Sequence, residues 1–237
     1  VNFNNARFIT PCLQSIFRQN YKKIEIIFVD DQSTDKSMEV IKKFKKKIKI
    51  MQTDKKMGKG SFNQTYAFLC GFNKSKGDVV FFLDSDDYFA KNKVKKIMND
   101  FEKNNKYKII FDLPIKKFFK KEIKINKKNL SFRNYWTYIP PTSCISIRRK
   151  YLSKIFKLVD TKLFPDIWLD FRIGIVAKYI WNNLNIKSEH LTYYRQLETN
   201  ISSNFNFLSV NWWRRRKEAH FYIKFFFIKN KIKYIKN

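Results

Sequence analysis

Residues 77–88 read GDVVFFLDSDDY, in which five consecutive apolar residues are followed by three carboxylates in four positions. An apolar run of this length between polar residues is typical of a strand buried on both faces inside a parallel sheet. Neighbouring carboxylates repel one another, and a cation between them favours their ionised form. Mg²⁺ and Mn²⁺ prefer carboxylate oxygens and keep coordination sites for phosphate. The stretch therefore predicts a metal–diphosphate site at the end of a strand.

A second apolar run precedes this one and also ends in acids. Residues 24–29 predict a buried strand that leads into Asp30 and Asp31, and helices are expected at 36–46 and 62–73 around a short strand at 48–51. This alternation is typical of a doubly wound α/β layer, in which ligands bind beyond the carboxyl ends of the strands. Residues 1–5 resemble the end of a further strand, so we expect most of that first strand to precede residue 1.

The rest of the chain is less regular. We expect helices at about 91–104 and 167–181, strands at 108–111, 144–147 and 191–195, and a basic excursion at 116–130. From residue 207 the chain is expected to be helical, basic and aromatic. The predicted division is a first half at 1–112, a second half of the same domain at 113–205, and a C-terminal helical tail at 206–237.

The charge of the chain is strongly positive. With 50 Lys and Arg against 20 Asp and Glu, the formal net charge is +30. Such a field favours polyanions, namely nucleotide phosphates, nucleic acid or an acidic membrane, although most lysines are equally compatible with a solvated surface. Three separated cysteines without a CxxC pattern argue against a zinc site or a disulfide framework. No apolar run approaches the roughly 18 residues that span a bilayer. We therefore expect a cytoplasmic protein, with peripheral contact to the inner face of a membrane as an open alternative.

The ordered trio Phe3-Asn4-Asn5, residues 26–35 (IIFVDDQSTD) and residues 82–87 (FLDSDD) resembles the family 2 glycosyltransferases. The likeness covers about residues 1–112 well and continues more loosely to about residue 200. It implies an inverting enzyme with the GT-A fold, a three-layer α/β/α arrangement around a mainly parallel central sheet. It also implies transfer of a sugar from a nucleotide-sugar donor, of UDP type, to a glycan or lipid-linked acceptor in the synthesis of cell-surface polysaccharide.

The resemblance implies a nucleotide-sugar-binding half at 1–112, the donor side, and an acceptor-binding half at 113–205. It assigns roles to individual residues of the donor side. Phe3 would stack on the base, because stacking on a ring face needs only a flat ring, and Asp31 would accept the ring N–H of a uracil-type base. Asp84-Ser85-Asp86 would be the DxD motif, with Asp86 a direct ligand of Mg²⁺ or Mn²⁺ and Asp84 on the ribose or a metal-bound water. The remaining assignments are Asp87 as a further metal ligand and Asn4 and Asp30 as nucleotide-binding residues, Asp30 being equally compatible with a cap or turn.

An inverting transfer needs a base that takes the proton of the acceptor hydroxyl. The family carries it as the second residue of a Glu-Asp pair, which here falls on Pro165-Asp166. Asp166 is thus the predicted base and Asp170, one helical turn further, the alternative. Asp166 is also compatible with a helix cap. Tyr193-Tyr194-Arg195 resembles the family's late Tyr-Arg element and assigns Arg195 to the diphosphate, while a His that often follows is replaced by Leu197.

The tail and three rival functions complete the predictions. Trp212-Trp213-Arg214-Arg215-Arg216 and residues 221–237 suit an interfacial helix on anionic lipid, and equally a helix packed on the domain. A haloacid dehalogenase phosphatase also has DxD after a buried strand, but Tyr88 stands where that family has Thr or Val. Nucleic-acid binding lacks a motif, and acids at two strand ends would repel a phosphate backbone. The third rival is an inactive nucleotide-binding protein of the same fold.

Overall fold

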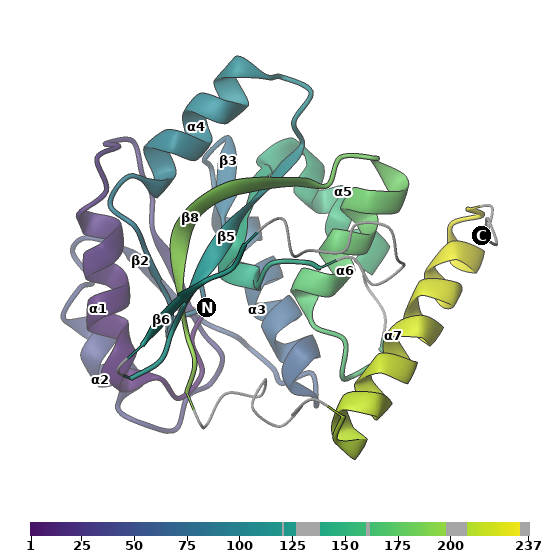
Figure 1. Ribbon diagram of the computed structural model, residues 1–237. Coiled ribbons are helices and arrows are strands. Elements are labelled where there is room, and N and C mark those ends of the chain that lie inside the picture. The colour runs from purple at the N-terminus through teal and green to yellow at the C-terminus, as the bar shows by residue number, and fades with distance from the viewer. Residues whose placement is uncertain (120, 127–137, 160–161, 198–207, 233–237) are drawn as a thin grey trace.

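The computed structural model describes residues 1–119, 121–126, 138–159, 162–197 and 208–232. A curled β-sheet runs through the middle of the molecule, and helices lie on either side of it (Figure 1). The C-terminal helix lies at the far edge, beyond α5 and α6.

The first half of the chain, residues 1–112, begins with alternating helices and strands. Its elements are α1 (Ala6–Phe17), β1 (Ile27–Asp30), α2 (Ser37–Lys42), β2 (Lys49–Gln52), α3 (Gly60–Lys74), β3 (Val79–Phe81), β4 (Tyr88–Phe89) and α4 (Lys93–Lys103). The two strands β1 and β2 pair in parallel, with Ile27 opposite Lys49. This is the predicted βαβ order, although α2 ends four residues earlier than expected.

The second half supplies most of the main sheet. Its elements are β5 (Ile109–Lys117), β6 (Glu122–Lys124), a 3₁₀ turn (Thr142–Cys144), β7 (Ile145–Arg148), α5 (Arg149–Val159), α6 (Leu169–Ile175) continued by a π-helical turn (Val176–Ile180), β8 (Asn185–Arg195) and α7 (Val210–Lys229). Helix α5 was not among the predicted elements.

The main sheet is mixed rather than mainly parallel, which corrects one part of the prediction. Its strands follow the order β3-β7-β5-β8-β4, with β6 paired to β5. The pair β5–β8 is parallel, whereas β3–β7, β5–β7, β4–β8 and β5–β6 are antiparallel. The apolar runs correctly indicated strands, but an apolar run alone does not fix strand direction, because helices cover antiparallel strands here as well.

The three-layer arrangement can be followed along β5. Ile109 and Phe111 belong to the large core that also contains α3, α5, α6 and α7 residues, whereas Ile110 packs with Ile97 and Phe101 of α4. Successive side chains of a strand point to opposite faces, so β5 contributes to two cores. Because β5 spans residue 112, the two predicted halves share one sheet.

Strand β3 is less buried than predicted. Val79, Val80 and Phe81 are each half-buried, because an apolar cavity of about 390 Å³ lies between β3 and β1. Val1 and Asn2 connect the carboxyl ends of these two strands: the Asn2 N–H donates to the Val29 carbonyl at 2.9 Å, and the Ser85 N–H donates to the Val1 carbonyl at 2.9 Å.

Candidate functional site

A pocket of about 500 Å³ lies where the chain leaves β1 and β3. Its volume is within the range of small-molecule sites. Residues from both halves line it: Val1, Phe3, Asn4, Asn5, Asp31, Gly60, Asn63, Gln64, Asp84, Ser85, Asp86, Pro141, Thr142, Trp168, Asp170, Tyr194 and Arg215. The pocket therefore brings together Phe3, Asn4, Asp31, Asp84, Asp86 and Asp170 of the predicted site residues.

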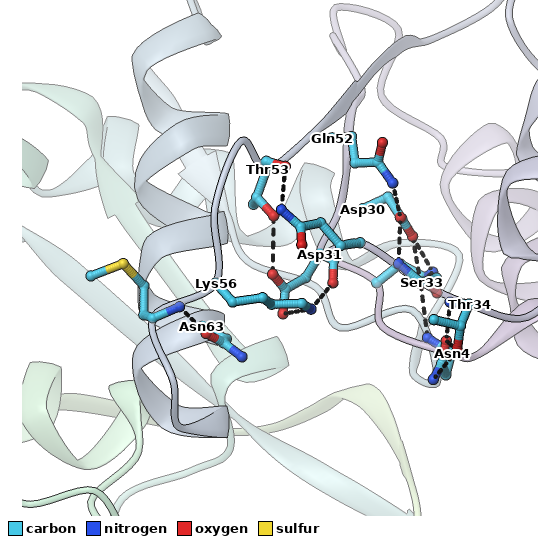
Figure 2. A network of polar contacts seen from close by, with 12 residues as sticks. Asn4, Asp30, Asp31, Ser33, Thr34, Gln52, Thr53, Lys56 and Asn63 are labelled. Atoms are coloured by element: carbon cyan, nitrogen blue, oxygen red, sulfur yellow. Dashed lines mark hydrogen bonds and ion pairs between the residues drawn. The ribbon is translucent and has the colours of Figure 1, made fainter.

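One end of the pocket carries an aromatic face and a carboxylate. Phe3 is 51% exposed, whereas Asp31 is 4% exposed. Thr53 Oγ1 donates to Asp31 Oδ1 at 3.0 Å, and Lys56 Nζ lies 3.1 Å from Asp31 Oδ2 (Figure 2). The Lys56 ammonium also lies 4.2 Å from the centroid of the Phe3 ring. This end can hold a flat group that stacks on Phe3 and donates to Asp31.

Asp30 and Asn4 shape the neighbouring turn. Asp30 is fully buried, and its carboxylate accepts from Asn2, from the Ser33 N–H and hydroxyl, and from Gln52. Asn4 has a φ of 51° and accepts the Thr34 N–H at 2.7 Å through its side chain. Figure 2 shows both residues turned into this network. Asp30 is therefore placed to fix the turn, whereas Asn4 both fixes the turn and lines the pocket.

The other end of the pocket carries Asp84 and Asp86. Gln64 Nε2 donates to both carboxylate oxygens of Asp84, at 3.1 and 3.3 Å. Burial and the nearby Asp86 raise the pKa of Asp84 to about 7, and burial also raises the pKa of Asp86. Two half-buried carboxylates that repel each other are a donor set that suits a hard divalent cation.

Asp84 and Asp86 could supply only part of the coordination of Mg²⁺ or Mn²⁺. Within the described ranges, no group of three or more His, Cys, Asp or Glu side chains could hold a metal ion. Mg²⁺ is commonly held by one or two carboxylates together with substrate phosphates and water. Asp84 and Asp86 therefore fit a cation that enters with a diphosphate.

Asp87 faces away from the pocket. It is fully buried, and its two oxygens accept the Ser143 hydroxyl at 2.6 Å and the Arg195 N–H at 2.9 Å. Burial and Asp86 raise the pKa of Asp87. Ser143 in turn accepts the Asp84 N–H at 3.1 Å. Both carboxylate oxygens of Asp87 thus have partners within the protein, and Asp87 is absent from the pocket lining, so metal ligation by Asp87 stays a prediction.

The two candidate bases have different surroundings. Asp166 does not line the pocket: Arg214 Nε lies 3.0 Å from its Oδ2, and Glu218 accepts its N–H. Asp170 lines the same pocket as Asp84 and Asp86, and its charge contributes to the raised pKa of Asp84. Burial raises the pKa of Asp170, while the charge of Arg215 and the Phe171 N–H act in the opposite direction.

Arg195 does not line the pocket, but it contacts the Asp84–Asp86 segment from outside the lining. Its guanidinium donates to the Asp86 carbonyl and lies 4.8 Å from the Phe8 ring and 4.6 Å from the Tyr88 ring. Arg195 therefore holds the Asp86 backbone in place. The neighbouring Tyr194 reaches the pocket instead.

Several pocket residues were missed by the sequence predictions. They come from five places in the chain: Gly60, Asn63 and Gln64 at the start of α3, Pro141 and Thr142 before β7, Trp168 before α6, Tyr194 in β8 and Arg215 in α7. Pro140-Pro141-Thr142-Ser143 was the available signal for one of these segments, because Pro pairs interrupt regular structure.

The family of the chain follows from a comparison over the same region. A model described as glycosyl transferase family 2 matches residues 1–156, which include Phe3, both acidic strand ends and Ser143. The chain belongs to glycosyl transferase family 2. This membership excludes the haloacid dehalogenase alternative.

Three relatives of this family 2 chain are informative. An uncharacterized glycosyltransferase of Nostoc sp. strain PCC 7120 is 32% identical over 211 residues, which are 82% of this chain and 62% of that protein. A dolichyl N-acetyl-alpha-D-glucosaminyl phosphate 3-beta-D-2,3-diacetamido-2,3-dideoxy-beta-D-glucuronosyltransferase of Methanococcus voltae is 36% identical over 104 residues, 39% of this chain and 30% of that protein. The chain thus spans less than two thirds of the length of these relatives.

The third relative is TarS of Staphylococcus aureus, a poly(ribitol-phosphate) beta-N-acetylglucosaminyltransferase. Its structure with UDP has a TM-score of 0.60 at 19% identity, covering 83% of this chain and 59% of TarS 1–349. Its structure with UDP-GlcNAc has a TM-score of 0.61 at 19% identity, with coverage of 85% and 58%. The likeness confirms the predicted GT-A fold class.

In the described part of the chain, no helix is long and apolar enough to cross a bilayer.

Proposed function

We propose that the chain transfers a sugar from a nucleoside-diphosphate sugar, of UDP type, to a hydroxyl of a glycan or lipid-linked acceptor, with inversion at the anomeric carbon. One observation carries the proposal: Phe3 and Asp31, Asp84 and Asp86, and Asp170 line the same pocket. Phe3 and Asp31 supply a subsite for the nucleobase, and Asp84 and Asp86 supply a subsite for the metal and the diphosphate. Asp170 supplies the general base for the acceptor hydroxyl. The finding that TarS binds UDP and UDP-GlcNAc on the same fold supports the donor class.

The donor is held at both ends. The base stacks on the exposed face of Phe3 and donates its ring N–H to Asp31, whose other oxygen is kept in place by Thr53. Asp84 and Asp86 hold Mg²⁺ or Mn²⁺ beside the diphosphate. A cation at this point supplies Lewis-acid stabilisation of the leaving diphosphate. Gln64, Ser143 and Arg195 keep the Asp84-Ser85-Asp86 segment in position.

Asp170 is the favoured base, in place of Asp166. It lines the pocket together with Asp84 and Asp86, whereas the Asp166 carboxylate is paired with Arg214 and does not line the pocket. A raised pKa suits a general base, since the carboxylate then holds the acceptor proton more strongly. Asp170 would take the proton of the acceptor hydroxyl while the hydroxyl oxygen attacks the anomeric carbon in line with the departing diphosphate.

The acceptor is proposed to be part of a surface glycan or carried on a lipid. The names of TarS and of the Methanococcus protein include one acceptor of each kind. Helix α7 supports a location at an anionic membrane surface, on the cytoplasmic side. Its buried face packs on the core through Tyr222, Ile223 and Phe226, while Trp213, Phe221 and Ile228 are 54%, 52% and 70% exposed.

The metal assignment is tested with a single substitution. Asp86→Asn is expected to abolish Mn²⁺-dependent binding of UDP, because an amide is a weaker ligand and leaves Asp84 alone at the cation. Calorimetric titration with UDP, with and without Mn²⁺, measures the effect. Asp78→Asn is the matched control, since Asp78 is an exposed acid at the start of the same strand region and outside the pocket.

Wild-type affinity of Asp86→Asn in the presence of Mn²⁺ would contradict the metal role. Metal-dependent hydrolysis across a panel of nucleotide sugars then separates an active transferase from an inactive protein of this fold. Binding of UDP without hydrolysis or transfer of any sugar would favour the inactive alternative.

A further inference from the structure

The base subsite of this structure contains a cation supplied by the chain itself. Lys56 Nζ lies 4.2 Å from the centroid of the Phe3 ring and 3.1 Å from Asp31 Oδ2. It also donates to the main-chain carbonyl of Asp31. Figure 2 shows the Lys56 side chain extended toward Asp31 from the segment between β2 and α3. The ammonium therefore lies between the two side chains to which the proposed function assigns the base.

The ammonium and a nucleotide base would use the same features. An ammonium over an aromatic face is attracted by the electrons of the ring, and its N–H groups donate to the carboxylate. A base that stacks on Phe3 and donates its ring N–H to Asp31 needs the same face and the same oxygen. The two occupants therefore exclude one another. We propose that Lys56 is an internal occupant of the base subsite, which the nucleotide has to displace; this rests on the proposed function.

The local structure allows such an exchange. The Lys56 side chain is 34% exposed, and it comes from a run of exposed residues at 54–56, so a change of side-chain rotamer suffices to remove it. The Asp31 side chain is 6% exposed, and a buried carboxylate without a partner is costly. Thr53 remains on Asp31 Oδ1 when Lys56 leaves. The ring N–H of the base then replaces the lysine N–H on Oδ2.

The exchange lowers the affinity for any ligand of this subsite. Each binding event has to break a partly exposed ion pair and a cation–π contact, which together correspond to about a tenfold change in the dissociation constant. Uridine is the appropriate probe, because it is neutral and gains nothing from the charge of the lysine. Lys56→Met removes the ammonium but keeps a flexible side chain of similar length.

The test compares the dissociation constants of uridine for wild type, Lys56→Met and two controls, measured by NMR titration. We expect Lys56→Met to bind uridine about tenfold more tightly than wild type. Lys55→Met changes the net charge equally at the adjacent position, where the lysine lies 5.3 Å from the Tyr66 ring, and should behave as wild type. Lys56→Arg restores the cation and should also bind as wild type. Raising the NaCl concentration should strengthen uridine binding to wild type but not to Lys56→Met, because salt screens the ion pair.

Two outcomes overturn the inference, and they differ from failure of the proposed function. The first is that wild type binds UDP with Mn²⁺ but Lys56→Met binds uridine no more tightly than wild type does. This result would show that Lys56 does not compete for the subsite. An equal gain in Lys55→Met would assign the effect to net charge. If wild type binds neither uridine nor UDP with Mn²⁺, the nucleotide site itself is wrong, and the inference falls with it.

Discussion

Asp166 lies in the turn before α6 and Asp170 in the first turn of that helix, and their neighbours give them different surroundings. Arg214 and Glu218 of α7 engage the side chain and the N–H of Asp166, which suits a residue that anchors the start of α6 to α7. Asp170 instead lines the same pocket as Asp84 and Asp86, with Arg215 nearby. These surroundings favour Asp170 over Asp166 as the proposed base.

Substitution of each acid by its amide separates the two roles. Asp170→Asn is expected to lower kcat for sugar transfer by about 10² to 10⁴, the contribution of a positioned general base, and to leave UDP affinity near wild type. Asp166→Asn should keep most of its transfer activity. Initial rates with saturating donor, together with UDP titrations, measure both effects. The opposite pattern would return the role of base to Asp166.

The same residue predicts the pH profile of transfer. Asp170 acts as a base in its ionised form, and burial raises its pKa above the ordinary value. The rate should therefore increase with pH through this raised pKa. Asp84, Asp86 and Arg215 line the same pocket, and the charge of Arg215 acts against the rise in the pKa of Asp170. Asp170→Asn should remove this limb of the profile, and an unchanged limb in that variant would contradict the assignment.

At the residue scale, the donor side was predictable because its residues follow strands that can be recognised in the sequence. Phe3, Asp31, Asp84 and Asp86 all line the pocket, as the trio of motifs implied. The separation of Asp87 from Asp86 was not predictable, since it depends on Ser143, 56 positions away. Likewise, the partners that draw Asp166 aside come from α7.

Among the elements, α7 is unusual in carrying apolar side chains on both of its faces. Ala219, Tyr222, Ile223, Phe226 and Phe227 are buried. The opposite face repeats Trp213, Lys217, Phe221, Lys224 and Ile228 at helical spacing, and all five are exposed. Glu218 is the sole acid of this helix and turns toward Asp166. An exposed face with rings and lysines but no acid fits an anionic lipid surface.

The exposed face of α7 is tested on vesicles. Wild type is expected to sediment with phosphatidylglycerol vesicles and not with phosphatidylcholine vesicles. A double variant, Trp213→Ala with Phe221→Ser, should bind at least about tenfold more weakly, because it removes two large apolar groups from the interface. Phe119→Ser is the control, since Phe119 is a 94% exposed aromatic between β5 and β6, away from α7 in the sequence. Equal binding by all three proteins would exclude this face as the membrane contact.

The elements themselves show what the sequence could and could not indicate. The strands that end in acids were predicted, because apolar runs between polar residues mark them clearly. Helix α5 was missed, although Leu152, Ile155, Phe156 and Val159 have the spacing of a helix face buried against a core. The direction of β7 was not predictable, since its neighbours β3 and β5 are set by tertiary pairing.

At the scale of the whole molecule, a buried polar network joins the two halves. Lys93 of α4 and Asp112 of β5 are both fully buried and form an ion pair at 2.7 Å. Lys93 also donates to the Ser143 carbonyl and to Thr192 of β8. Because Ser143 holds Asp87, the network connects the sheet to the metal end of the pocket.

Breaking this ion pair should destabilise the entire domain. Lys93→Met leaves Asp112 buried without its cation, which is expected to cost about 3–5 kcal/mol of unfolding free energy. Urea unfolding followed by fluorescence should show one transition that shifts as a whole. The double variant Lys93→Met with Asp112→Leu should recover much of the loss, because no charge is then left unpaired. Two separate transitions in wild type would contradict a shared domain.

Burial of the Arg172 charge constrains the order in which the chain can fold during its synthesis. This buried guanidinium donates to the carbonyls of Val159, Leu163, Phe164 and Ile167 and lies 5.1 Å from the Tyr222 ring. Its charge can be enclosed only after Tyr222 has left the ribosome. The segment that carries Asp166 and Asp170 should therefore remain open to chaperones until α7 emerges, and this side of the pocket should close later than the side that carries Phe3 and Asp31.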